Sequence, residues 1–177
     1  LYNYCMNNWE NYCQVAYDTL RSQRKNWEDE NMRRPITRLW YTCVHACGTP
    51  NPNPPLISES ALIEKSQGAS ISDDHCYAPE KRCYMIMDMP GKFLADYTEF
   101  KTLFYESTRT IKVSKHEYKR LSKMKDIPVH LRYKEAGIVL RERVGRRWTF
   151  EDTEPYKNNV LEQIPEFVKY EAKYILE

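Results

Sequence analysis

The sequence has few glycines and no long apolar run. Only five of its 177 residues are glycine, so we do not expect a glycine-rich loop that cradles phosphate groups. A membrane-spanning helix needs roughly 20 consecutive apolar residues. The longest candidate, from Leu39 to Cys47, contains a threonine and a histidine. The sequence therefore predicts a protein without a transmembrane segment.

The motifs of common hydrolases are also missing. We find no Gly-x-Ser-x-Gly sequence, no cysteine in a catalytic context and no His-Glu-x-x-His helix. Paired acids such as Asp73-Asp74 and Glu151-Asp152 lie beside expected loops or helix starts, where capping explains them. We therefore expect neither catalysis nor a cofactor.

The composition is that of an ordinary globular protein, apart from its aromatic residues. Hydrophobic residues make up 41% and charged residues 29%, which favours a packed core over disorder. Fourteen tyrosines and four tryptophans are typical of cores and also of surfaces that bind partners. The net charge is only +2, so the whole chain has no strong field for polyanions.

All six cysteines lie in the first 83 residues. An even number favours disulfide bonds and therefore an oxidising compartment, either the mitochondrial intermembrane space or the extracellular space. Two antiparallel helices joined near Pro35 would place Cys13 near Cys43 and Cys5 near Cys47. A further bond between Cys76 and Cys83 would close a local loop. The disulfide candidates are Cys5, Cys13, Cys43, Cys47, Cys76 and Cys83.

A zinc site is the alternative use of these cysteines. Four of them, with His75 in reserve, offer the right ligand types. Zinc modules usually place two to four residues between the ligands of each pair, and the spacing of Cys76 and Cys83 is longer. We therefore favour disulfide bonds and expect no metal.

Hydrophobic periodicity predicts an α+β fold that is mostly helical, in a single domain over residues 1–177. Residues 1–48 are expected to form a disulfide-laced helical hairpin, with its second helix starting at Pro35. Residues 49–83 form an irregular connection rich in proline and serine, with a short helix near Ser58 to Lys65. Residues 84–177 form a cysteine-free α+β part.

In this second half, residues 83–89 read as a strand and residues 92–106 as an amphipathic helix. Ser114 and Glu117 have the spacing of a capping box, which predicts the start of another helix. A last helix is expected to begin near Thr153.

Positive charge is the strongest regional signal. Residues 111–147 contain twelve lysines and arginines against four acids. Val129–Tyr133 and Ile138–Val144 alternate apolar with charged residues and predict a β-hairpin with a basic face. We favour the interpretation that the acidic residues 151–177 neutralise part of this face within the fold, and an open face that binds a partner is the alternative. The candidate partner-binding residues are Arg132, Lys134, Arg141, Arg143, Arg146 and Arg147.

The sequence predicts a non-catalytic protein-interaction or structural accessory subunit of a larger assembly. The alternative is a secreted, disulfide-stabilised protein that binds a ligand or receptor. The expected partners are other proteins, through an acidic surface or as neighbours in an assembly. Nucleic acid is not expected, because disulfide bonds and nucleic acid seldom share a compartment.

Overall fold

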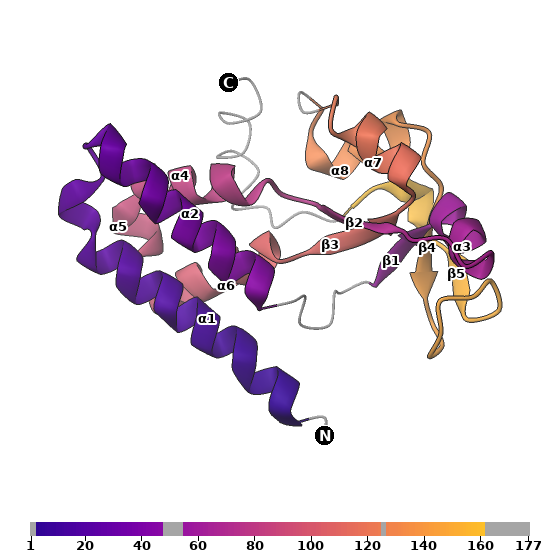
Figure 1. Cartoon of the computed structure of the whole chain (residues 1–177), viewed down its shortest axis with the longest axis horizontal. Helices are drawn as coiled ribbons and strands as arrows, with labels where there is room; N and C mark the ends of the chain where they lie inside the picture. Colours follow the sequence, from indigo (N-terminus) through magenta and orange to yellow (C-terminus); the bar gives the residue numbers. More distant parts are fainter. Residues whose placement is uncertain (1–2, 48–54, 125–126, 162–177) are drawn as a thin grey trace. The chain divides into compact units, whose positions relative to one another are not determined.

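The computed structural model describes residues 3–47, 55–124 and 127–161, and divides the chain into two compact units (Figure 1). Unit 1 comprises Leu1–Pro50 and Tyr77–Arg109, and unit 2 comprises Asn51–Cys76 and Thr110–Glu177. The protein is α+β, with eight α-helices and a five-stranded sheet in the described residues. The three predicted parts do not coincide with the units, because residues 77–109 join the N-terminal helices. The single domain stays a prediction.

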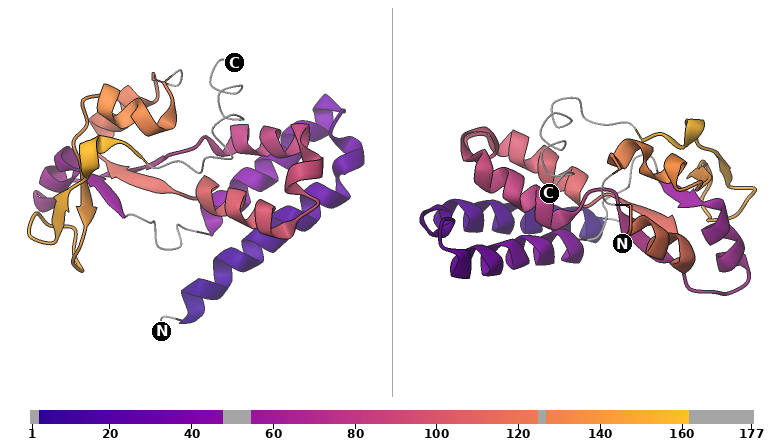
Figure 2. Two further views of the ribbon diagram at one scale, coloured as in Figure 1. Left: turned by 180° about the vertical axis from the view of Figure 1, so that it is seen from behind. Right: turned by 90° about the horizontal axis from the view of Figure 1, so that it is seen from above.

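Unit 1 is built from helices in its described residues. Asp29 caps the second helix by accepting a hydrogen bond from the Asn31 backbone N–H (2.9 Å), so this helix begins before Pro35 and contains it. The first two helices run antiparallel and lie side by side in both views (Figures 1 and 2). The helices are α1 (Asn3–Ser22), a 3-10 turn (Arg24–Asn26), α2 (Glu30–Ala46), α4 (Pro79–Asp88), α5 (Pro90–Phe93) and α6 (Tyr97–Ser107).

Aromatic side chains fill the core of unit 1. Trp40 packs edge-on against Phe100 and Phe104, with ring centroids 5.8 and 5.4 Å apart. Its indole Nε1–H donates to the Pro79 carbonyl oxygen (2.6 Å), and the Tyr17 hydroxyl donates to the carbonyl oxygen of Leu94 (2.9 Å). Much of the aromatic surplus in the sequence therefore serves packing.

The predicted disulfide lacing is wrong for the described cysteines, since none of them forms a disulfide bond. Cys13, Cys43 and Cys83 are buried thiols that act as small apolar residues within the helical packing. The predicted bonds of Cys47 and Cys76 are likewise not formed. The side chain of Cys5 lies outside the described residues. The helical hairpin is held by its apolar and aromatic contacts instead.

Unit 2 contains the mixed sheet, in the strand order β2-β3-β1-β4-β5. Strands β1 and β3 are parallel neighbours, and all other pairs are antiparallel. A buried cluster of Ile57, Ala61 and Leu62 lies where β1 meets the following helix. The elements are β1 (Leu56–Ser58), α3 (Glu59–Ser66), β2 (Ser72–His75), β3 (Thr110–Val113), α7 (Lys115–Leu121), α8 (Val129–Glu135), β4 (Leu140–Arg143), β5 (Thr153–Pro155) and a 3-10 turn (Lys157–Asn159).

The predicted hairpin of residues 129–144 is wrong. Residues 129–135 form helix α8, which buries Tyr133 and is followed by Gly137 with a positive φ of 65°. Glycine with positive φ ends helices as readily as it forms hairpin turns, so the sequence signal was ambiguous. The hairpin that forms pairs β4 with β5, and Arg143 lies opposite Thr153.

Other expectations were met unevenly. The short helix near Ser58 is α3, and the capping box at Ser114 starts α7. The predicted strand at residues 83–89 is instead helix α4, which has Pro79 in its first turn. The predicted helix over residues 92–106 is interrupted before Asp96, which caps α6. The predicted last helix falls on strand β5 and then on residues outside the described ranges.

Candidate cationic binding surfaces

Two buried serines and one glutamate fix the start of helix α7. The Ser114 hydroxyl accepts from the backbone N–H of Glu117 (3.1 Å), and the Glu117 carboxylate accepts from the backbone N–H of Ser114 (2.9 Å). The same carboxylate oxygen accepts from the Ser58 hydroxyl (2.5 Å), which in turn caps α3. Because β1 and β3 are parallel neighbours, both helix starts lie at one edge of the sheet. Glu117, the only acid in α7, therefore points inward and is 5% exposed.

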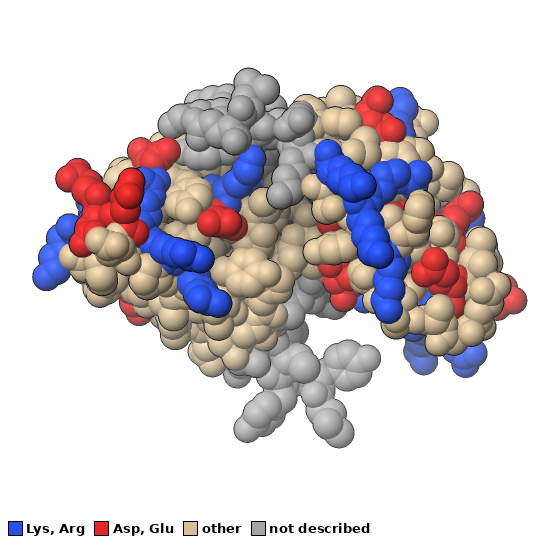
Figure 3. All heavy atoms as spheres, turned by 45° about the horizontal axis from the view of Figure 1, so that its top comes forward, with Lys and Arg blue, Asp and Glu red and all other residues tan. Residues whose placement is uncertain are grey.

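The outward side of α7 is cationic. Lys115 and Lys119 are exposed one turn apart, and Lys123 continues their spacing just beyond the helix, at about 6 Å per step along the axis. Arg120 is exposed beside them. Figure 3 shows a band of lysine and arginine side chains over the part of unit 2 that carries α7 and α8. We call Lys115, Lys119, Arg120 and Lys123 the cationic row.

The cationic row has no carboxylate partner within residues 3–47, 55–124 and 127–161. None of the ion pairs formed by these residues involves a member of the row. His116 and Tyr118 are exposed on the same short helix, and no exposed acid separates the positive charges. The row is therefore a uniform patch of positive charge.

Two of the six predicted basic-face residues have internal partners. Arg132 Nη2 lies 3.2 Å from Asp74 Oδ2 and also donates to the backbone carbonyl of His75 (3.3 Å). Arg141 Nη1 lies 3.0 Å from Glu59 Oε1, and its Nη2 donates to the Thr153 carbonyl (2.8 Å). These two arginines connect α8 to β2 and β4 to its neighbours.

Asp74 holds a second contact that attaches α8 to the sheet. The buried Tyr133 hydroxyl donates to Asp74 Oδ2 (2.5 Å). Burial raises the pKa of the Asp74 carboxyl above its usual value, and the nearby charge of Arg132 partly opposes this shift. Asp74, Arg132 and Tyr133 together form a buried polar group that has a structural function.

The remaining four predicted residues keep their charge nearer the surface. Lys134, Arg146 and Arg147 are exposed, and Arg143 is partly buried. The guanidinium carbon of Arg143 lies 4.6 Å from the centre of the Trp148 ring. The structure thus does not bring all six together into one face.

Arg146 and Arg147 lie in the loop of residues 144–152 between β4 and β5, which we call the arginine loop. The Asp152 carboxylate accepts from the backbone N–H of Arg147 (2.7 Å), and its carbonyl accepts from those of Val144 (2.9 Å) and Gly145 (3.0 Å). A Cβ atom at Gly145 would lie 2.2 Å from Asp152 Oδ1, so only glycine fits. These contacts close the loop upon itself.

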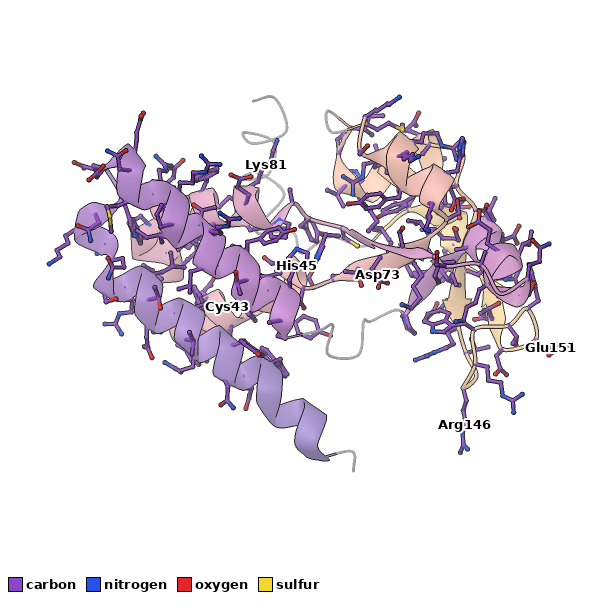
Figure 4. The ribbon with its side chains drawn as sticks, in the orientation of Figure 1. Cys43, His45, Asp73, Lys81, Arg146 and Glu151 are labelled. Atoms are coloured by element: carbon purple, nitrogen blue, oxygen red, sulfur yellow. The ribbon has the colours of Figure 1, made fainter. Side chains whose placement is uncertain are left out.

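The arginine loop is anchored at its centre and exposed at its end. Trp148 packs against the buried cluster of unit 2. Arg146 points away from the sheet (Figure 4). Val144 and Phe150 are 59% and 45% exposed, which adds apolar surface beside the two arginines.

The structure offers weaker support for a metal site, a ligand pocket or a membrane-spanning helix. Among the described residues, no three His, Cys, Asp or Glu side chains form a group that could hold a metal ion, so the zinc alternative gains no support. A pocket in unit 1 combines Arg24 and Arg33 with Glu28 and Asp88, and Arg33 Nη2 lies 3.6 Å from Asp88 Oδ1. A lining with charges of both signs selects no particular ligand. No helix in the described ranges has the length and apolarity to cross a membrane.

The chain matches no model of a known protein family, no curated protein and no solved structure in three comparisons. The candidate site is therefore defined by geometry and charge alone.

The sequence analysis located the basic region of residues 111–147 but did not single out the cationic row on α7. The capping box at Ser114 fixes the register of α7, which turns Glu117 and Leu121 inward. That register leaves Lys115 and Lys119 on the outer side. The sequence therefore contained the signal for the cationic row.

Proposed function

We propose that this is a non-catalytic interaction protein that binds a polyanionic surface through unit 2. The cationic row on α7 is the main contact, and the arginine loop is a second one. The observation that carries the proposal is the inward position of Glu117, which leaves the outer side of α7 without negative charge. Membership of a larger assembly, as an accessory subunit, belongs to this proposal.

The polar contacts of unit 2 support binding rather than catalysis. The Ser58 hydroxyl and the Glu117 carboxylate are close, but both are buried and occupied in capping two helices. Asp74 and Tyr133 are also buried and satisfied by each other. The outer side of α7 presents mainly cations, which attract an anionic partner.

Affinity chromatography on heparin tests the proposal with charge-matched variants. Lys115→Gln combined with Lys119→Gln removes two charges from the row. Lys65→Gln combined with Lys157→Gln removes two exposed charges elsewhere in unit 2. We expect the full chain to be retained and eluted by salt, the row variant to elute at clearly lower salt, and the control to elute like the wild type. Absence of retention, or equal shifts for both variants, contradicts the proposal.

The oxidising compartment and the secreted alternative stay predictions. Both depend on disulfide bonds, which the described cysteines do not form. An acidic protein remains the partner class that the sequence alone favours.

A further inference from the structure

The structure of the arginine loop indicates which class of anionic partner these surfaces bind. Two adjacent arginines are presented by a hairpin that Asp152 closes and Trp148 anchors. Because these backbone contacts exist before any partner binds, presenting the arginines costs little ordering of the chain. A preformed loop with two adjacent exposed arginines suits an anionic groove into which arginine side chains can insert.

We propose that the partner is double-stranded DNA, with the arginine loop in the minor groove and the cationic row on backbone phosphates. This inference rests on the proposed function, since it names the polyanion. The minor groove of B-form DNA is about 6 Å wide, and its negative potential is strongest in narrow A/T-rich segments, which attract inserted arginines. The minor groove of A-form RNA is wide and shallow, so it would enclose inserted arginines less closely.

A DNA duplex accounts for two separate cationic surfaces better than an acidic protein does. Arg146 and helix α7 lie at different ends of unit 2 (Figures 1 and 4). The charge of a duplex is uniform and continues along both strands, so we expect an extended duplex to offer phosphates to the row and a groove to the loop. An acidic protein would need two acidic patches at matching positions. The argument against nucleic acid came from expected disulfide bonds, and the described cysteines do not form them.

Single strands and anionic membranes fit the observed side chains less well. Proteins that bind single strands stack bases on aromatic rings. Trp148 is packed on the unit 2 cluster and covered by Arg143, with Lys112 Nζ 6.0 Å from its ring centre. Membrane binding draws on a buried apolar face, and the loop offers only Val144 and Phe150.

Fluorescence anisotropy with the full chain tests the inference. The probes are A/T-rich and G/C-rich DNA duplexes of about two helical turns, a matching RNA duplex, a single strand, a polyglutamate peptide and phosphatidylserine vesicles. We expect the tightest binding to the A/T-rich duplex, and competition by a small A/T-specific minor-groove ligand. Each lost phosphate contact should reduce the slope of log affinity against log salt by about 0.9.

The two surfaces should respond differently to substitution. Arg146→Gln with Arg147→Gln should lower affinity for the A/T-rich duplex about tenfold and remove the preference over G/C-rich DNA. Lys115→Gln with Lys119→Gln should weaken binding to every duplex and reduce the salt slope. The control pair at Lys65 and Lys157 should change neither.

The possible failures are distinguishable. Retention on heparin without DNA binding overturns the DNA assignment and leaves the polyanion proposal standing, whereas loss of both overturns both. Equal or tighter binding to polyglutamate, RNA, single strands or vesicles identifies another partner class and overturns the inference. An unchanged A/T preference in the variant lacking both loop arginines overturns the placement of the loop.

Discussion

Replacing Glu117 tests how two helix starts are held together at one edge of the sheet. Its buried carboxylate accepts hydrogen bonds from the Ser58 hydroxyl and the Ser114 backbone N–H. In Glu117→Ala both donors lose their acceptor inside the protein. Each unsatisfied buried donor costs about 1–3 kcal/mol, so we expect the free energy of unfolding to fall by about 2–6 kcal/mol.

Two further variants separate the hydrogen bonds from the packing of the side chain. Glu117→Gln keeps the shape and one acceptor oxygen, so a loss of about 1–2 kcal/mol is expected. Ser58→Ala removes the cap of α3 and one donor to Glu117, at a cost of about 0.5–2 kcal/mol. If the two groups interact, the double variant should lose less than the sum of the single losses.

The assay is urea unfolding followed by circular dichroism, together with amide hydrogen exchange. The backbone N–H of Ala61 donates to the Ser58 hydroxyl, and that of Glu117 donates to the Ser114 hydroxyl. The exchange rates of these two amides therefore report the caps of α3 and α7 directly. Both amides should exchange faster in Glu117→Ala. Unchanged stability, unchanged exchange or strictly additive losses would refute the reasoning.

Three further predictions concern pH, thiols and the loop. Burial raises the folded-state pKa of Asp74 above 3.8, so its stabilising contribution is complete below that pH and is lost as the pH rises through the raised value. Wild-type protein should therefore lose stability relative to Asp74→Asn on titration upward, and a constant difference would contradict this. Burial raises the pKa of Cys13 to about 11 and that of Cys83 to about 12, so mass spectrometry should find both unalkylated in the native protein at mildly alkaline pH and alkylated in urea. Failure to alkylate them in urea without a reductant would show that they are oxidised. Gly145→Ala should displace the arginine loop, cost about 1–3 kcal/mol and reduce DNA affinity, as measured by unfolding and anisotropy; full affinity would show that the loop needs no fixed shape.

Local signals predicted part of the local structure. The serine and glutamate spacing at Ser114 predicted the start of α7, and the helical hairpin follows from apolar periodicity in residues 1–46. The short apolar run at residues 83–89 was ambiguous between strand and helix. Proline in the first turn of α4 is compatible with the helix that forms.

Long-range pairing could not be predicted from the sequence. The strands are three or four residues long, which is too short for a periodic signal. Two arginines that were predicted to lie on the surface pair with acids that are far away in the sequence. Asp74 is 58 residues from Arg132, and Glu59 is 82 residues from Arg141. Charge counts therefore located the basic region, but only the fold separates arginines with internal partners from exposed ones.

One buried carboxylate connects the stability of unit 2 with its surface charge. An exposed acid at position 117 would lie beside Lys115 and Lys119 and would weaken their attraction for an anion. Inside the protein, the same carboxylate holds the starts of α3 and α7, and its charge is balanced by hydrogen-bond donors rather than by the lysines. The lysines then face solvent without a neutralising neighbour on their own helix. The arrangement that stabilises the sheet edge is therefore also the one that leaves α7 able to attract a polyanion.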